Sequence, residues 1–232
     1  MASTFSPHPS PRALIRRGTW LIPIAGLAQG ILWTIWMGAP DADRDTRAFA
    51  AWQAGPLGLA TGVAFHAALI GLILGCGALY AYLVADRASG WALAGFVCGV
   101  VSSGFMLAAF GALTIGGAMV ADVYLNGKPE TRDALLVLAG GAFPTAMLVN
   151  YGLANLLGLV GAAANGVAFW RSGGLPRWSA IAFGVGFVGV QLGAPLISQL
   201  GALLLAVGGV GIARAMNRGM AARPMAVTAP AA

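Results

Sequence analysis

The chain has 232 residues, of which 59% are hydrophobic and 9% are charged, and its formal net charge is +6. A soluble domain carries about 25% charged residues, so this composition excludes an ordinary water-soluble globular fold. The basic residues stand singly or in small groups at the ends of apolar segments, a distribution that orients membrane proteins and argues against a nucleic-acid partner. Twelve of the thirteen are Arg, and an Ala-, Gly- and Arg-rich chain with one Lys is typical of GC-rich bacterial genomes. We therefore expect a bacterial inner-membrane protein.

Five long stretches contain no Asp, Glu, Lys or Arg. They are Gly18–Pro40, Ala48–Ala85, Ala88–Ala121, Ala134–Trp170 and Trp178–Ala213. A helix needs about 20 apolar residues to cross the hydrocarbon core of a bilayer, so each stretch is long enough. The sequence therefore predicts an all-α fold, a polytopic helical membrane protein with multiple passes through the cell membrane.

The fifth stretch is expected to form two helices rather than one. Gln191, Gly193 and Pro195 stand in its middle, and Pro suits the first turn of a following helix. Each half has about 16 to 18 residues and a length of roughly 25 Å, enough for a thin crossing. This division gives six transmembrane helices, with predicted spans 19–38, 57–84, 91–120, 142–169, 178–193 and 196–214.

Charge placement predicts the orientation of these six helices. With six crossings, one side of the membrane holds nine basic residues and one acidic residue, and the other holds four basic and six acidic residues. Cytoplasmic loops carry the excess of Arg and Lys, so both termini are predicted to be cytoplasmic. The expected organisation is an N-terminal tail at 1–18, a membrane domain at 19–214 and a C-terminal tail at 215–232.

Two features outside the spans are predicted. Phe49 and Trp52 are three residues apart in the first outer loop, which indicates a short helix lying on the membrane surface within Asp45–Pro56. The chain ends, Met1–Pro11 and Ala221–Ala232, are expected to be disordered.

His66 is an ionisable residue within the apolar spans, about 14 Å from the start of its helix and so near the membrane midplane. Gly58 and Gly62 share its helical face, which predicts a neighbouring helix there. The favoured interpretation is a neutral histidine hydrogen-bonded across helices. The alternative is a haem ligand, a metal ligand or a proton relay. A haem would need a second axial ligand, and Met106 is a possible one, since His8 lies in the tail.

The fourth span carries a polar stripe on one helical face. Its members, at spacings of three and four residues, are Tyr151, Asn155, Gly158, Ala162 and Asn165. Asparagine inside a membrane must find hydrogen-bond partners, so this face is expected to point into the bundle. It either fixes helix register, which is the favoured interpretation, or lines a polar pocket or permeation path.

Counting residues along each predicted helix places several polar residues near the midplane. The candidate ligand-binding layer consists of Gln29, His66, Ser102, Ser103, Asn150, Tyr151 and Asn155. Pockets combine apolar walls with a few polar groups, so this layer is the default site hypothesis. Cys76 and Cys98 are expected to be small buried hydrophobes, and no metal site is predicted.

The sequence contains no Ser-His-Asp set, HExxH motif, phosphate-binding loop or paired intramembrane carboxylates. The first functional hypothesis is a non-enzymatic membrane subunit, assembly factor or sensor that binds other membrane helices or a second copy, since small-residue motifs such as Gly71-x-x-x-Gly75 favour helix contact. The second is a small-molecule transporter or carrier that uses the polar layer. The third is a b-type haem or redox protein centred on His66.

Overall fold

The computed structural model describes residues 10–84, 89–128, 130, 142–192 and 194–222, and these residues form helices and connecting turns. The elements are α1 Pro11–Gly18, α2 Leu21–Met37, α3 Thr46–Ala54, α4 Pro56–Val84, α5 Ser89–Gly111, η1 Ala112–Gly116, α6 Gly117–Asn126, α8 Ala142–Ser172, α9 Arg177–Gln191 and α10 Pro195–Ala222. The element η1 is a π-helical turn that joins α5 to α6 without a break in the helix.

Five helical segments within the described residues are long and apolar enough to cross a membrane. They are Pro11–Met37, Pro56–Val84, Gly90–Asn126, Thr145–Ser172 and Leu196–Met220. The predicted all-α fold is therefore confirmed for the described residues, and the five segments indicate a multi-pass membrane protein. Helix α9 has only 15 residues and a length of about 22 Å, so it is too short to count among these segments.

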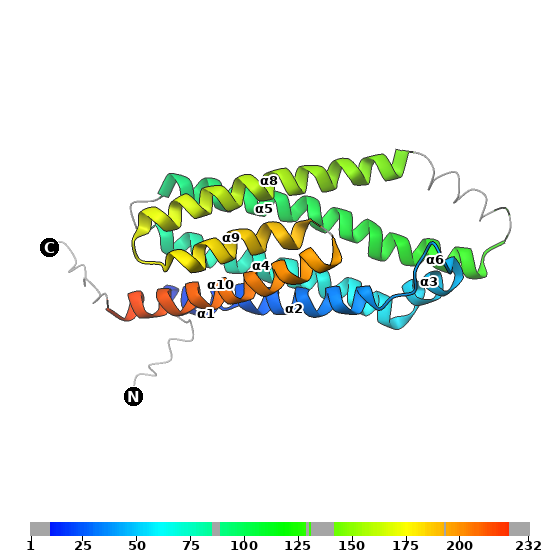
Figure 1. Cartoon of the computed structure of the whole chain (residues 1–232), viewed down its shortest axis with the longest axis horizontal. Coiled ribbons are helices and arrows are strands. Elements are labelled where there is room, and N and C mark those ends of the chain that lie inside the picture. The colour runs from blue at the N-terminus through cyan, green and yellow to red at the C-terminus, as the bar shows by residue number, and fades with distance from the viewer. Residues whose placement is uncertain (1–9, 85–88, 129, 131–141, 193, 223–232) are drawn as a thin grey trace, which may run out of the picture.

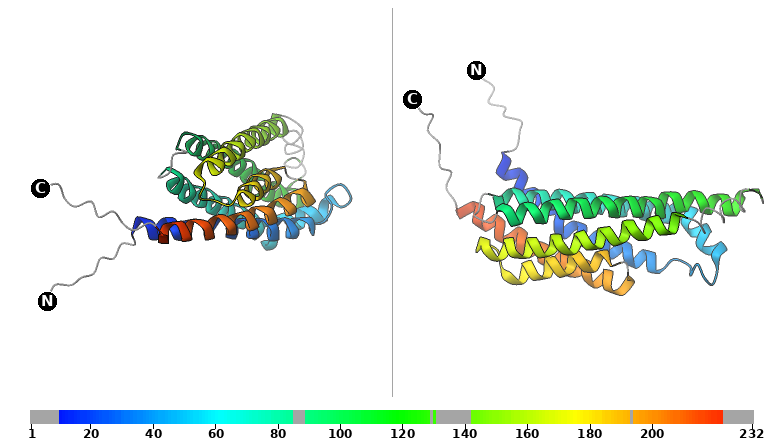
Figure 2. Two further views of the ribbon diagram at one scale, coloured as in Figure 1. Left: turned by 60° about the vertical axis from the view of Figure 1, so that its left-hand side comes forward. Right: turned by 90° about the horizontal axis from the view of Figure 1, so that it is seen from above.

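The long helices lie side by side (Figure 1), and their contacts form a closed ring. Going round the ring, α2 contacts α4, α4 contacts α5, α5 contacts α8, α8 contacts α9, α9 contacts α10, and α10 returns to α2. The views from two further directions show the same side-by-side arrangement (Figure 2). The ring encloses buried apolar clusters, the largest of which includes Ile22, Leu79, Phe169, Phe183 and Leu205.

The fifth charge-free stretch does fold back on itself. Helix α9 ends at Gln191 and α10 begins at Pro195, as the polar and proline residues there predict. The two helices lie very close, because a Cβ atom at Gly189 would stand only 2.9 Å from the Cα atom of Gly201. Glycine at both positions lets the two backbones meet.

Several helices extend beyond the predicted spans. Helix α10 runs eight residues past the predicted end at 214, because Met216 stays fully buried against the core while Arg214 and Arg218 point outward. Part of the predicted N-terminal tail is helix α1, where the side chain of Ser10 accepts a hydrogen bond from Ala13 N at 3.3 Å and caps the first turn. The third helical segment continues to Asn126. Disorder was predicted for Met1–Pro11 and Ala221–Ala232, yet Pro11 begins α1 and Ala222 ends α10. The rest of both predicted segments, 1–9 and 223–232, lies outside the described residues, and Ser10 lies just before α1.

A short helix, α3, lies within the range Asp45–Pro56 where one was predicted. Asp45 caps it by accepting a hydrogen bond from Ala48 N at 2.9 Å. The rings of Phe49 and Trp52 stack at 6.1 Å, and Trp52 meets Trp36 of α2 edge-on at 5.2 Å. These contacts fix α3 against the end of α2.

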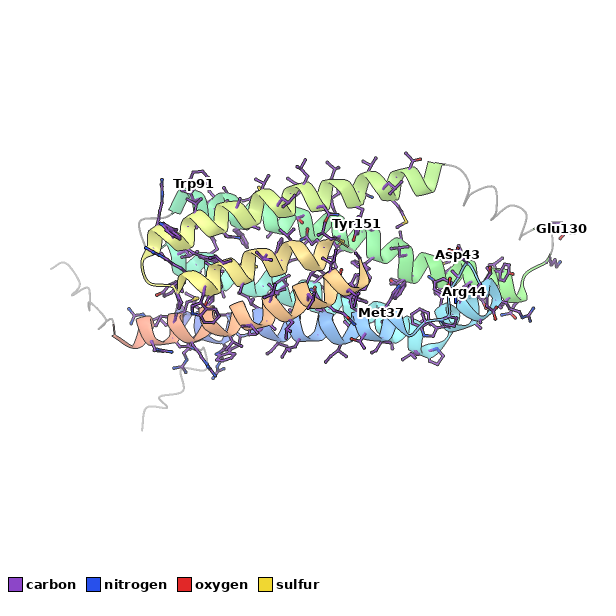
Figure 3. The ribbon with its side chains drawn as sticks, in the orientation of Figure 1. Met37, Asp43, Arg44, Trp91, Glu130 and Tyr151 are labelled. Carbon is purple, nitrogen blue, oxygen red and sulfur yellow. The ribbon has the colours of Figure 1, made fainter. Side chains whose placement is uncertain are left out.

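The two ends of the bundle differ in the charged residues that they carry. The described acidic residues lie around α3 and the end of α6, where Asp43, Arg44 and Glu130 are labelled, and Trp91 marks the opposite end (Figure 3). That opposite end holds both α1 and the last turns of α10 (Figure 1), with Arg residues and no described acid.

Candidate functional site

A buried polar contact joins three helices near the end of α9. Ser102 on α5 is fully buried, and its hydroxyl donates a hydrogen bond to the carbonyl oxygen of Ala154 on α8 at 2.7 Å. The same hydroxyl lies 3.1 Å from Oε1 of Gln191 on α9. The amide of Gln191 fills the space beside Gly158, where any Cβ atom would collide with it. This contact therefore fixes α9 to α5 and α8.

Gln29 on α2 is the second buried amide. It is 1% exposed, and neither its oxygen nor its nitrogen has a hydrogen-bond partner among the described residues. Its side chain borders a small cavity of about 10 Å³ that Gln191, Met106, Phe65 and Phe110 also line. A cavity of this size admits about one water molecule, so no solute larger than water fits between the two amides.

His66 forms its hydrogen bond within its own helix. Its Nδ1 lies 2.7 Å from the carbonyl oxygen of Gly62. A carbonyl only accepts, so Nδ1 carries a proton and donates it to this bond. Nε2 faces the end of α5, 3.5 Å from where a Cβ atom of Gly111 would stand. The hydrogen bond found for the imidazole therefore lies within α4, and the expected bond across helices is not found among the described residues.

The glycine face of α4 does meet neighbouring helices, as predicted. A Cβ atom at Gly62 would lie 2.6 Å from Cβ of Thr114 in η1, and one at Gly58 would overlap the backbone of α3. Close packing at these two glycines brings α3, α4 and the π-helical turn together.

Gln53 on α3 makes a contact that sequence reasoning missed. Its Nε2 donates a hydrogen bond to the carbonyl oxygen of Leu113 in η1 at 2.7 Å, and Gly117 leaves room for the amide. A π-helical turn shifts the regular backbone hydrogen bonds by one residue, and the side chain supplies a donor there. The two residues are 60 positions apart, and no sequence spacing connects them.

The polar stripe of α8 faces α5 and α9. Asn165 packs against Gly95 of α5, and Gly158 packs against Gln191 of α9. Asn155 donates to the carbonyl oxygen of Tyr151 at 2.9 Å on its own helix. The inward orientation agrees with the prediction, whereas one of its asparagines bonds within the helix rather than between helices.

The structure brings together only part of the predicted seven-residue layer. Gln29 borders the small cavity, and none of the other six residues lines that cavity. Ser102 reaches Gln191, whereas His66 and Asn155 bond within their own helices. Ser103 is buried, and Asn150 and Tyr151 are half-buried, with Tyr151 about midway along the bundle (Figure 3).

The His66–Met106 pair and the two cysteines are the candidate ligands for a cofactor or metal. Met106 lines the 10 Å³ cavity and His66 does not, so that space is no haem pocket for this pair. Cys76 and Cys98 are free thiols, both half-buried. Among the described residues, no cluster of three or more His, Cys, Asp or Glu side chains is found.

A groove of about 660 Å³ lies between α8 and α9. Its floor includes two small-residue pairs four positions apart, Ala162 with Gly166 on α8 and Ala180 with Gly184 on α9. Its wall is apolar apart from Arg177, whose guanidinium carbon lies 4.1 Å from the centroid of the exposed Trp170 ring. The groove is thus an apolar trough with a cation–π pair among its lining residues.

A second groove, of about 810 Å³, lies where α9 begins, and we call it the basic groove. Arg214 and Arg218, one turn apart on α10, form one wall, and Trp178 forms part of another. The loop before α9 turns at Gly173, which has φ 64°, a conformation that glycine adopts without strain.

Comparison of the chain with protein-family models, with curated proteins and with solved structures finds no match in any of the three.

Proposed function

We propose that the protein is a non-enzymatic membrane subunit or assembly protein that holds a transmembrane helix of a partner protein in the groove between α8 and α9. The observation that carries this proposal is the pairing of Ala162 with Gly166 and of Ala180 with Gly184 along one apolar trough. Small residues four positions apart allow helix backbones to approach closely in lipid. A third helix laid in the trough would meet both pairs.

Exposed apolar residues at the rim of the groove are evidence that another molecule binds there. Ile181 is 62% exposed and Val185 is 55% exposed, although both are apolar. A large exposed apolar surface marks an interaction site or contact with lipid. The alternative of a small-molecule carrier has less support, because the cavity beside Gln29 has a volume of only about 10 Å³.

A partner protein fits this groove better than a second copy does. In a twofold dimer the same patch lies against itself. Two concave troughs facing each other would enclose an empty space between the two copies. The side chains that line an empty space lose van der Waals contacts. A convex partner such as a single helix fills the trough.

We also propose that the chain crosses a bacterial inner membrane six times, with α9 as a thin fifth crossing and both termini in the cytoplasm. The excess of nine basic residues over one acidic residue on the side of the termini supports this orientation. The close pairing of α9 with α10 supports a hairpin of two crossings, and a thinned bilayer accommodates a short helix.

Photocrosslinking in the native membrane tests the partner. A photoreactive residue in place of Ile181 is expected to crosslink to one other membrane polypeptide, identified by mass spectrometry. Gly166→Phe should abolish the crosslink, because it fills the groove, while a Cβ atom at Gly166 meets nothing within 4 Å of the protein itself. Gly152→Phe is the matched control on the same helix, since its Cβ atom also meets nothing and it does not line the groove. Crosslinks that form only to lipid or to the protein itself would contradict the proposal, as would a crosslink that persists in Gly166→Phe.

Reporter fusions test the topology. Alkaline phosphatase fused after Arg218 should be inactive, and green fluorescent protein at the same position should fluoresce, because the cytoplasm permits only the second to mature. An active phosphatase fusion would contradict six crossings with cytoplasmic ends.

A further inference from the structure

We infer that the basic groove binds the phosphate-bearing headgroup of an anionic phospholipid. Arg214 and Arg218 both line this groove of about 810 Å³, and both are exposed. They lie four residues apart on α10 and so share one helical face. Two guanidinium groups at this spacing present several N–H donors to a single phosphate.

No described acidic residue neutralises these two charges. The ion pair found among the described residues joins Arg44 to Asp41 at 3.2 Å, beside α3 at the other end of the bundle (Figure 3). The guanidinium groups of Arg214 and Arg218 are thus available to an external anion.

The start of α9 adds a second source of positive potential. Pro176 precedes the helix, and both Pro176 and Trp178 line the groove. The first N–H groups of a helix have no intrahelical acceptor, and the helix dipole gives this end a partial positive charge. The helix end and the arginine pair therefore act on one space.

The remaining walls favour a lipid over free phosphate. Leu175, Val210 and Ala215 also line the groove, which gives it an apolar side next to the arginines. Trp178 is 54% exposed, and tryptophan is enriched where lipid headgroups meet the hydrocarbon core. A basic pocket between transmembrane helices at this level suits an anionic headgroup with its glycerol and upper acyl chain.

Lipid titration of the full chain purified in detergent tests this inference. By native mass spectrometry, phosphatidylglycerol is expected to bind more tightly than phosphatidylcholine, and inorganic phosphate is expected not to compete at equal concentration. The double variant Arg214→Gln/Arg218→Gln should bind phosphatidylglycerol roughly 10- to 30-fold more weakly, given the usual contribution of each basic residue near an anionic lipid. Arg214→Lys/Arg218→Lys should keep most of the affinity, because it keeps the charge.

The matched control is Arg16→Gln/Arg17→Gln, which removes two exposed arginines from α1 that do not line the groove. Its affinity should equal that of the native protein. Equal binding of the two lipids, or an unchanged affinity in Arg214→Gln/Arg218→Gln, would overturn the inference. Competition by inorganic phosphate would overturn the assignment to lipid. None of these outcomes depends on the partner helix, because the α8–α9 groove keeps its pairs of small residues in all these variants.

Discussion

At the scale of single residues, the buried polar side chains differ in whether the protein supplies their hydrogen bonds. Ser102 has a carbonyl acceptor at 2.7 Å on another helix. Gln29 is as deeply buried, yet neither atom of its amide has a partner among the described residues. Satisfied polar contacts stabilise membrane helix pairs, whereas an unpaired buried amide is unfavourable. The two residues should therefore respond in opposite ways to loss of polarity.

Ser102→Ala is expected to lower the free energy of unfolding by about 1 to 2 kcal/mol, because it removes the bond to Ala154 and leaves Gln191 without its hydroxyl neighbour. Thermal or denaturant unfolding of the purified protein in detergent measures this loss. Ser103→Ala is the control, since Ser103 is also buried and no hydrogen bond of its side chain to another described residue is found. Equal losses in both variants would show that the interhelical bond contributes nothing.

Gln29→Met should leave the free energy of unfolding unchanged or raise it, because Met keeps the volume and removes the unpaired amide. Gln29→Ala should lower the free energy by about 2 to 3 kcal/mol by enlarging the cavity. The same unfolding assay distinguishes the two. If Gln29→Met were as destabilising as Gln29→Ala, the amide would have a partner, such as a bound water molecule.

At the scale of elements, the π-helical turn η1 and the short helix α3 are joined by direct contacts. Gln53 of α3 bonds to Leu113 of η1, and Gly62 of α4 lets Thr114 approach. π-helical turns occur often at functional sites. Here the turn serves as an attachment point for α3 and lies next to Gly111, which faces His66.

Gln53→Met is expected to release α3 from the turn. Loss of one hydrogen bond of about 1 kcal/mol should raise hydrogen exchange of the α3 amides roughly fivefold, measured by mass spectrometry in detergent. Gln199→Met is the control, because that amide bonds to Thr34 between α10 and α2 at 3.0 Å. Unchanged exchange in α3 of Gln53→Met would refute the attachment.

At the scale of the whole molecule, the ring depends on the α9–α10 hairpin that closes it. Gly201→Leu should lower the free energy of unfolding by about 3 kcal/mol or more, because its Cβ atom would lie 2.8 Å from the Cα atom of Gly189 and force the helices apart. Gly104→Leu should change little, since a Cβ atom there meets nothing within 4 Å. The yield and melting temperature of the two variants in detergent provide the comparison, and similar values for both would contradict the role given to the hairpin.

Local patterns in the sequence predicted most of the architecture. Charge-free runs predicted the long helices. Gln191, Gly193 and Pro195 predicted the reversal, and Phe49 with Trp52 predicted the short helix α3. These features depend on residues close together in the chain. The contacts of Ser102 with Ala154 and of Gln53 with Leu113 join residues 52 and 60 positions apart, so they depend on how the helices are placed in space. For the same reason, the position of each residue along its helix predicted one layer of seven polar residues, and the folded chain brings only some of them together.

We propose that the polar interior stabilises the fold and that the α8–α9 groove binds a transmembrane helix of a partner protein. Measuring unfolding and crosslinking at position 181 in the same two variants, Ser102→Ala and Gly166→Phe, tests it most directly. We expect Ser102→Ala to lose stability and keep the crosslink, and Gly166→Phe to keep stability and lose the crosslink. A crosslink that persists in Gly166→Phe, or one abolished in Ser102→Ala without loss of stability, would contradict it.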